Sequence, residues 1–156
     1  LAIITKYGVK EKKILKDIPI KNIALIDKKV FGGKDMISYA KLGVSLDYGP
    51  DKTGKNFPLA VRHIKNILKN VGVIDGVGKK YKEKNIYTVS GTYDVSKDFK
   101  HDIKLKDFKL IKKSQLVGKD KKGKIFSKVD FYPLFLGDGR YNGTLALIAK
   151  KKKVIL

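Results

Sequence analysis

Cysteine and tryptophan are absent from this chain, and methionine occurs once. Without cysteine the chain can form neither a disulfide framework nor a thiolate metal site, which is compatible with a reducing cytoplasm. No apolar run approaches the roughly 20 residues of a membrane-spanning helix, and the N-terminus lacks the basic-then-apolar pattern of a signal peptide. We therefore expect a cytoplasmic protein with no membrane partner.

Arginine and acidic residues are also scarce. Of the 36 basic residues only Arg62 and Arg140 are arginines, and 15 acidic residues leave a formal charge of +21. Such a charge ordinarily indicates nucleic acid or an anionic surface as partner. Phosphate and base recognition favour the bidentate guanidinium group, however, and the lysines are spread through every segment. A compositional bias therefore explains the charge better than a designed groove, although a positive field would still attract a small acidic substrate.

Apolar and turn-forming residues predict an α/β chain. We expect a buried strand at 22–27 and another at 44–48, the second ending at Gly49-Pro50. The clearest helix is expected from Pro58 to Val71, with Asn56 as its cap. Its apolar residues recur every three or four positions, as Ala60, Val61, Ile64, Ile67, Leu68 and Val71.

After Gly72 the pattern changes to short β-rich runs separated by turns. Such runs occur at 85–90 and 116–118, a hairpin is expected at 119–124, and a last strand at 144–149 precedes a lysine tail. These features predict a small, mostly β C-terminal domain. We divide the chain into domains at residues 1–78 and 79–156.

Two segments about eighty residues apart, 43–50 (GVSLDYGP) and 130–141 (DFYPLFLGDGRY), carry a family resemblance. Together they resemble the aspartoacylase and succinylglutamate desuccinylase family of zinc carboxypeptidase-like hydrolases, and the likeness runs from about Lys21 to Lys150. The resemblance implies part of a carboxypeptidase-like mixed sheet with a helix, followed by the small β-rich domain.

The resemblance assigns roles to three residues. Asp47 falls at the family's catalytic carboxylate, usually Glu, which acts as general base and proton shuttle for a zinc-bound water. Tyr141 matches a tyrosine that contacts substrate, and Asp138 matches a carboxylate, again commonly Glu, that supports the site's hydrogen bonds. Each position has a structural alternative: Asp47 anchors the Tyr-Gly-Pro turn, Tyr141 is a half-buried aromatic, and Arg140 pairs with Asp138 at the surface.

Departures from the family are as informative as the matches. The family's metal site needs a His-x-x-Glu pair and a later His, but this sequence contains no His-x-x-Glu, and its only histidines are His63 and His101. We expect His63 to be an exposed or boundary residue of the helix and not a metal ligand. Ile37 stands where aspartoacylases carry a substrate-binding arginine; Lys34 or Lys41 could substitute only as a point charge.

These patterns lead to a preferred interpretation and two alternatives. The chain resembles the C-terminal half of a zinc-dependent amidohydrolase, a deacylase acting on an N-acyl acidic amino acid such as N-acyl-aspartate or N-succinylglutamate. Zinc would be bound outside this chain, by a missing N-terminal half or a partner chain, and the protein is an enzyme if that half is present. The first alternative is a non-catalytic or accessory member of the family that lacks the metal site. The second is a basic nucleic-acid-binding protein.

Overall fold

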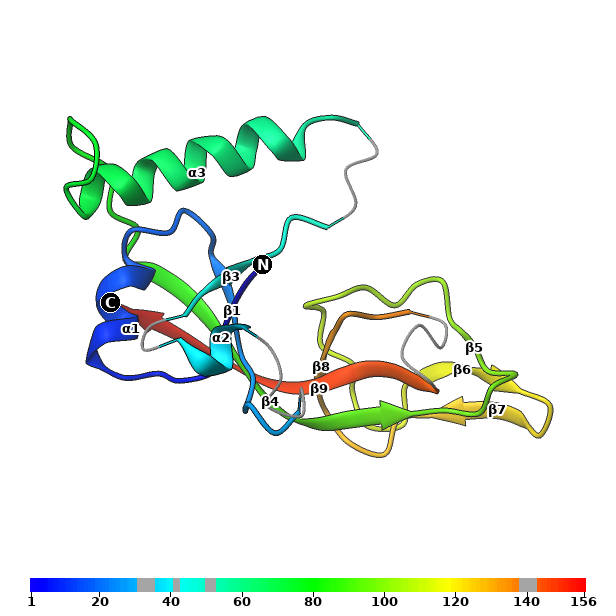
Figure 1. Ribbon diagram of the computed structural model, residues 1–156. Helices are drawn as coiled ribbons and strands as arrows, with labels where there is room; N and C mark the ends of the chain where they lie inside the picture. Colours follow the sequence, from blue (N-terminus) through cyan, green and yellow to red (C-terminus); the bar gives the residue numbers. More distant parts are fainter. Residues whose placement is uncertain (31–35, 41–42, 50–52, 138–142) are drawn as a thin grey trace. The chain divides into compact units, whose positions relative to one another are not determined.

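The computed structural model describes residues 1–30, 36–40, 43–49, 53–137 and 143–156, without the side chain of Ser38. The chain forms two compact units (Figure 1). Unit 1 consists of residues Leu1–Ile86 and Lys152–Leu156, and unit 2 of Tyr87–Lys151. These units are defined by packing, and the division at residues 78 and 79 stays a prediction.

A mixed six-stranded sheet has the strand order β3-β1-β2-β4-β9-β8. Its first three strands are β1 (Ala2–Ile4), β2 (Asn22–Leu25) and β3 (Ser45–Leu46). β1 pairs in parallel with β2 and antiparallel with β3, so that Ile3 lies between Ala24 and Ser45. The two long strands β4 (Glu83–Asp94) and β9 (Thr144–Ile155) both run from one unit into the other.

Unit 1 adds three helices to its strands: α1 (Val9–Leu15), α2 (Met36–Tyr39) and α3 (Asn56–Asn70). Its core forms where apolar residues of β1, β2 and β4 meet the end of α1. The buried members are Ala2, Ile4, Leu15, Ile18, Ile23 and Ile86. The helix predicted from Pro58 to Val71 is present as α3, whereas β1 and α1 were not predicted.

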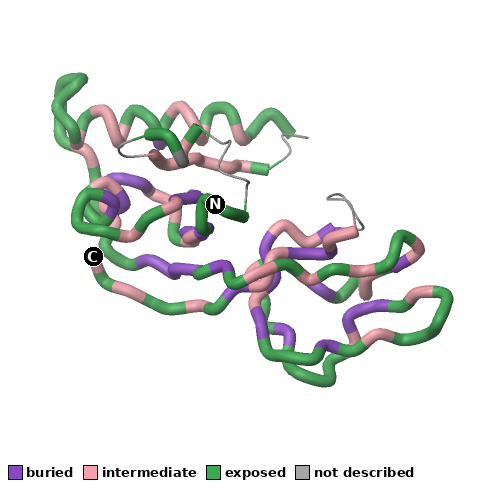
Figure 2. Tube along the Cα trace, turned by 60° about the horizontal axis from the view of Figure 1, so that its bottom comes forward, coloured by how far each residue is buried: buried purple, intermediate pink, exposed green. Residues whose placement is uncertain are grey.

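α3 is less buried than its apolar pattern suggests. Most of the helix is exposed or intermediate in Figure 2. Among its residues only His63 is buried, and Ile64 stays 48% exposed. Asn56 is not the cap of the helix, because Lys55 occupies that position and makes no capping hydrogen bond with its side chain. The amphipathic pattern thus predicted the position of the helix correctly. It did not reveal which face of α3 the rest of the described chain covers.

Unit 2 contains a three-stranded antiparallel sheet of β5 (Lys100–His101), β6 (Leu116–Asp120) and β7 (Gly123–Phe126). The predicted hairpin joins β6 to β7, and Gly123 has the positive φ, 128°, expected of its glycine. β8 (Tyr132–Leu134) pairs antiparallel with β9. A second core holds the unit together, with buried Phe99, Leu105, Ile111, Val117, Phe131, Leu145 and Ala146.

The expected fold class is confirmed: a mixed sheet with one long helix, followed by a small β-rich part. The last strand is longer than predicted, because β9 continues through the lysine run 150–153 to Ile155. Lys150, Lys152 and Lys153 of this run are exposed, whereas Lys151 is half-buried with its Nζ 5.7 Å from the ring centroids of both Tyr87 and Tyr132. No described helix has the length and apolar character needed to cross a membrane.

Candidate functional site

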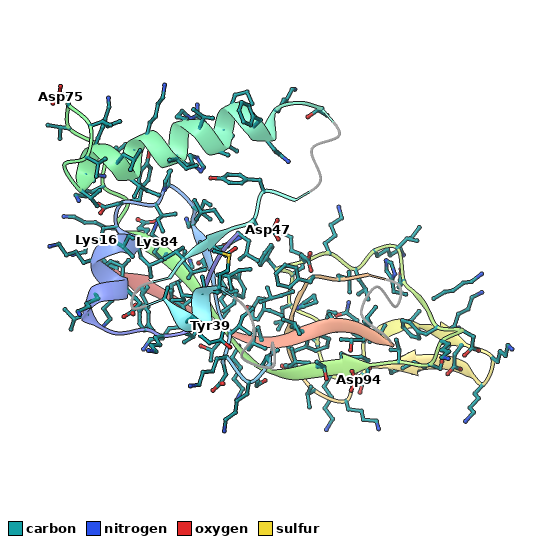
Figure 3. The ribbon with its side chains drawn as sticks, viewed as in Figure 1. Lys16, Tyr39, Asp47, Asp75, Lys84 and Asp94 are labelled. Atoms are coloured by element: carbon teal, nitrogen blue, oxygen red, sulfur yellow. The ribbon has the colours of Figure 1, made fainter. Side chains whose placement is uncertain are left out.

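Asp47 lies directly after β3, at the end of the strand (Figure 3). The Asp47 N–H donates to the Leu1 carbonyl, and the Leu1 nitrogen donates to the Asp47 carbonyl, both at 2.8 Å. Because Leu1 directly precedes β1, these two bonds fix the end of β3 beside β1. The side chain is half-buried, and its Oδ1 accepts a 2.7 Å hydrogen bond from the Gly49 N–H. Gly49 has φ 69°, a conformation that suits glycine. The hydrogen bond required by the turn-anchoring interpretation is therefore present.

One oxygen of Asp47 remains available for chemistry. Oδ2 has no hydrogen-bond partner among the residues that the structure describes, whereas Oδ1 is held by Gly49. A carboxylate with one oxygen fixed by a backbone N–H and the other open is oriented and can still accept a proton. Anchoring the turn and acting as a base are thus compatible roles for this side chain.

Tyr48 and His63 form a pair beside Asp47. The Tyr48 hydroxyl lies 2.9 Å from His63 Nδ1, and the ring centroids are 5.5 Å apart. His63 is 8% exposed, and burial, reinforced by the positive charge of Arg62, lowers the pKa of its imidazole. Burial raises the pKa of the Tyr48 phenol. At neutral pH the phenol is therefore protonated and the imidazole neutral, so that the phenol donates to Nδ1 in one tautomer and Nδ1–H donates to the phenol oxygen in the other.

His63, expected to be an exposed or boundary residue of the helix, is instead buried, with 8% of its surface exposed. It is the residue of α3 that packs deepest, and Tyr48 supplies the partner that a buried imidazole needs. The sequence signal that could have indicated this is a spacing of seven from Asn56, which puts both residues on one helical face.

Asn56 contacts the same turn from the first residue of α3. Its Nδ2 donates to the Tyr48 carbonyl at 2.8 Å and approaches the Gly49 carbonyl at 3.4 Å. The asparagine therefore holds the loop before the helix and does not cap the helix itself. Asn56 and His63 were not identified as site residues from sequence, because their partners are backbone atoms and a phenol supplied by tertiary structure.

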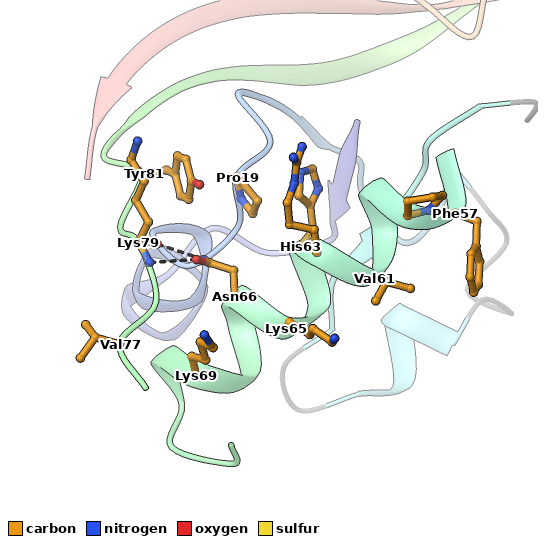
Figure 4. Close-up of a pocket in the computed structure, with 12 residues that line it drawn as sticks. Pro19, Phe57, Val61, His63, Lys65, Asn66, Lys69, Val77, Lys79 and Tyr81 are labelled. Atoms are coloured by element: carbon orange, nitrogen blue, oxygen red, sulfur yellow. Dashed lines mark hydrogen bonds between the residues drawn. The ribbon is translucent and has the colours of Figure 1, made fainter. Parts of the chain in front are cut away.

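A groove of about 950 Å³ is lined by residues of α3 together with Pro19, Val77, Lys79 and Tyr81 (Figure 4). Asn66 of α3 holds the segment at Lys79, accepting from the Lys79 N–H at 2.8 Å and donating to the Lys79 carbonyl at 3.0 Å. Tyr81 lies in the same wall, with Lys79 Nζ 5.6 Å from its ring centroid. Among the described residues the lining contains no carboxylate, and its cations are Arg62, Lys65, Lys69 and Lys79.

A buried lysine lies behind this wall, in the first residues of β4. Lys84 is 1% exposed and donates to the carbonyls of Ile18 and Ile20, the latter at 3.0 Å. Burial lowers its pKa to about 8, and the nearby Asp17 carboxylate opposes the shift. Asp17 itself is paired with Lys80. No sequence signal distinguishes this lysine, because the chain contains thirty-three others.

Other predicted site residues cannot be placed beside Asp47. Asp138, Arg140 and Tyr141 lie outside the described residues, as do Lys34 and Lys41. No described group of His, Cys, Asp or Glu residues could hold a metal ion. His63 belongs to unit 1 and His101 to unit 2, and His63 Nδ1 is engaged by Tyr48.

Known proteins match this chain in structure but not in sequence. No family model matches it, and no curated protein matches it. Murine aminoacylase 3 superimposes with a TM-score of 0.71 at 17% identity, covering 98% of this chain and 58% of its own. A succinylglutamate desuccinylase from Vibrio parahaemolyticus gives a TM-score of 0.62 at 17% identity over 96% of this chain and 48% of its own.

A third structure, a succinylglutamate desuccinylase from Silicibacter, gives a TM-score of 0.64 at 12% identity, with 100% of this chain and 53% of its own covered. This chain thus spans about half the length of the solved structures that it matches. At such identities the likeness concerns the fold, and it confirms the fold that segments 43–50 and 130–141 implied. The chain therefore has the fold of the C-terminal part of the aspartoacylase and succinylglutamate desuccinylase family.

Proposed function

We propose that this chain is the C-terminal part of a cytoplasmic deacylase that hydrolyses the amide bond of an N-acyl acidic amino acid. The observation that carries the proposal is Asp47, a carboxylate at the end of a sheet strand whose Oδ1 is bonded to Gly49 and whose Oδ2 has no hydrogen-bond partner among the described residues, in a fold shared with an aminoacylase and succinylglutamate desuccinylases. The formal charge of +21 supports an acidic substrate, because a positive field raises the local concentration of anions.

Asp47 is the proposed general base. Its Oδ2 would accept a proton from the water that attacks the substrate carbonyl and pass it to the leaving amine, while Gly49 keeps the carboxylate oriented. Tyr141 is proposed to donate its phenol to a substrate carboxylate or carbonyl oxygen, and Asp138 to support that hydrogen-bond network. Both assignments come from the family resemblance.

Zinc is the cofactor that the family implies, but the described residues do not fit a zinc site. They offer no set of three ligands, and His63 is already bonded to Tyr48. We propose that zinc is held by a polypeptide supplying the rest of the neighbours' fold, as a missing N-terminal half or a partner chain. When bound there, zinc would polarise the substrate carbonyl and its water.

Asp47→Asn tests the role of the carboxylate directly. Asparagine keeps an oxygen that can accept from Gly49, so the turn is preserved while the base is lost. We expect hydrolysis of N-acetyl-aspartate or N-succinylglutamate, followed by release of the free amine, to fall by about a hundredfold to ten-thousandfold. Asp75→Asn, in the exposed loop after α3, is the matched control and should keep wild-type activity.

The non-catalytic alternative makes the opposite prediction. Ile37 in place of the family arginine, and aspartate at both 47 and 138 where glutamate is common, favour an accessory protein. Zinc content measured by elemental analysis separates the two: a chain that carries no zinc and releases no amine, alone or with its complementary polypeptide, would support the accessory role. Zinc binding near one ion per complex, with amine release that depends on Asp47, would support the deacylase.

The groove along α3 favours nucleic-acid binding as a second candidate function. Four cations line it, with no carboxylate among the described residues, and such a positively charged groove can follow a nucleic-acid backbone. The test is fluorescence anisotropy with a labelled oligothymidylate as salt is raised. Replacing Arg62, Lys65 and Lys69 by glutamine should reduce the salt dependence by about two to three ions, whereas replacing Lys119, Lys122 and Lys124 should not. Equal losses in both triple variants would mean nonspecific attraction to the total charge.

A further inference from the structure

We infer that α3 positions the Asp47 carboxylate, with Asn56 and His63 as the two positioning residues. The role of this positioning in catalysis rests on the proposed function, whereas the contacts that produce it do not. Asn56 reaches the backbone of the Asp47 turn, and His63 reaches the Tyr48 side chain. Both residues come from α3, seven positions apart, and therefore act as two anchors on one rigid element.

The first anchor fixes how the end of the strand is turned. Tyr48 directly follows Asp47, and both residues lie just beyond β3 (Ser45–Leu46). Holding the Tyr48 phenol 2.9 Å from His63 Nδ1 limits movement of the backbone next to Asp47. His63 is 8% exposed, and its ring pairs with the phenol without needing a counter-ion. The backbone that carries the Asp47 side chain is thereby held in place.

The second anchor fixes the peptide groups that follow. Asn56 Nδ2 lies 2.8 Å from the Tyr48 carbonyl, which belongs to the same peptide group as the Gly49 N–H. That N–H is the donor to Asp47 Oδ1 at 2.7 Å. Because a peptide group is planar, holding its carbonyl also sets the direction of its N–H. The hydrogen bond from Asn56 therefore reaches the carboxylate through one rigid group and leaves Oδ2 open.

Hydrolysis is expected to be sensitive to this arrangement. A displacement of about 1 Å from the productive geometry can reduce a rate on the order of a hundredfold. Asp47 is also one methylene shorter than the glutamate common in the family, so a carboxylate with a shorter reach depends more on how its backbone is held. Neither positioning residue has to touch substrate for this effect.

The test uses two readouts on the same variants. The first is the Gly49 amide resonance, whose shift should change in one step as Asp47 ionises, because its N–H bonds to Oδ1. The second is amine release, analysed as kcat and KM separately. The variants are Asn56→Ala, His63→Leu and Tyr48→Phe, with His63→Gln as the conservative replacement whose amide oxygen can accept from the phenol.

Asn70→Ala is the matched control. Asn70 is on the same helix and also donates from Nδ2 to a backbone carbonyl, but its partner is Lys79, at 3.1 Å. We expect Asn56→Ala and His63→Leu to reduce the Gly49 step by about half or more and kcat by about tenfold to a hundredfold, with KM little changed. His63→Gln should restore much of both, and Asn70→Ala should match wild type.

The proposal is overturned if the Gly49 amide shift changes by the same amount in Asn56→Ala and His63→Leu as in Asn70→Ala. It is also overturned if the Gly49 amide shift of the wild type does not respond to Asp47. If His63→Leu fails to fold, Tyr48→Phe removes the same hydrogen bond from the other side with a smaller change of shape. Absence of amine release in every protein, wild type included, when zinc and the complementary polypeptide are present would contradict the proposed function. The Gly49 readout would still decide the positioning.

Discussion

The two units of this chain bury their apolar residues to different extents. Unit 2 surrounds its core with short strands and turns, and Phe131 and Val117 there are 1% and 0% exposed. Unit 1 has a comparable core, yet it also leaves Met36 and Val77 at 90% and 96% exposed. Much of α3 is uncovered as well. Exposed large apolar side chains also occur in unit 2, where Ile103 is 89% exposed, but most of those among the described residues belong to unit 1.

This difference agrees with the length of the structural neighbours, about half of which this chain covers. Exposed apolar side chains gathered in one part of a protein commonly mark a surface that meets another polypeptide. Unit 1 also carries Asp47, the proposed general base. The less buried unit is thus the one in which the proposed chemistry is located.

The largest expected effect tests the core of unit 2. Phe131→Ala removes a buried ring that stacks on Tyr93 with centroids 5.3 Å apart, and should lower the free energy of unfolding by about 3–5 kcal/mol. Met36→Ala in unit 1 should change it by no more than about 0.5 kcal/mol. Urea denaturation followed by circular dichroism measures both. Similar losses would contradict the contrast between the units.

The second prediction concerns Lys84 in unit 1. Its pKa in the folded chain is about 8, below its ordinary value of 10.5, so between these values the unfolded chain binds the extra proton. Stability should therefore increase as pH rises through this window, by up to about 3 kcal/mol. Lys84→Met should abolish the increase in urea denaturation series from pH 7.5 to 10. A wild-type curve that is flat or falls would refute the buried, charged lysine.

A pair of glycines tests the packing of unit 2. A Cβ on Gly118 would lie 2.3 Å from the Lys100 carbonyl oxygen and 2.4 Å from the Phe99 ring, whereas one on Gly91 meets nothing within 4 Å. We expect Gly118→Ala to destabilise the protein by about 1–3 kcal/mol and Gly91→Ala to be neutral or slightly stabilising. Thermal unfolding of the two variants measures the difference. A tolerant Gly118 would mean that this sheet is looser than its distances indicate.

The smallest effect concerns the Tyr48 and His63 pair. A double-mutant cycle with Tyr48→Phe and His63→Leu should give a coupling free energy of about 1 kcal/mol, typical of one hydrogen bond between neutral groups. Urea unfolding of the four proteins measures the coupling. Additive losses would show that the two side chains do not interact in solution and would weaken the link between α3 and Asp47.

Sequence reasoning succeeded where the signal was local. The hairpin at 119–124 and the helix after Pro58 were predicted from turn residues and from apolar spacing, and both are present. β1 and α1 were missed, because three apolar residues and seven residues rich in lysine give no distinct period. The length of β9 was missed for a related reason: a lysine run resembles a tail unless a paired strand is known.

The residues of the candidate site also fall into two groups, those that the sequence indicated and those that only the structure revealed. Asp47 was identified by the residues around it, and its hydrogen bond to Gly49 is a local turn that a sequence can specify. Asn56 and His63 were not identified, since each contacts residues seven or more positions away through the fold. Asp138 and Tyr141 remain predictions, because they lie outside the described residues.

By itself the sequence determined the α/β class, the long helix, the hairpin and the carboxylate that follows a strand before Gly-Pro. These depend on backbone preferences and apolar periodicity over a few residues, which each segment carries alone. Only the tertiary structure decided that His63 is buried against Tyr48, that Asn56 holds the Asp47 turn, and that Lys84 is enclosed by the carbonyls of Ile18 and Ile20. Burial and hydrogen-bond partners depend on segments that meet in space, and a single segment carries no record of them.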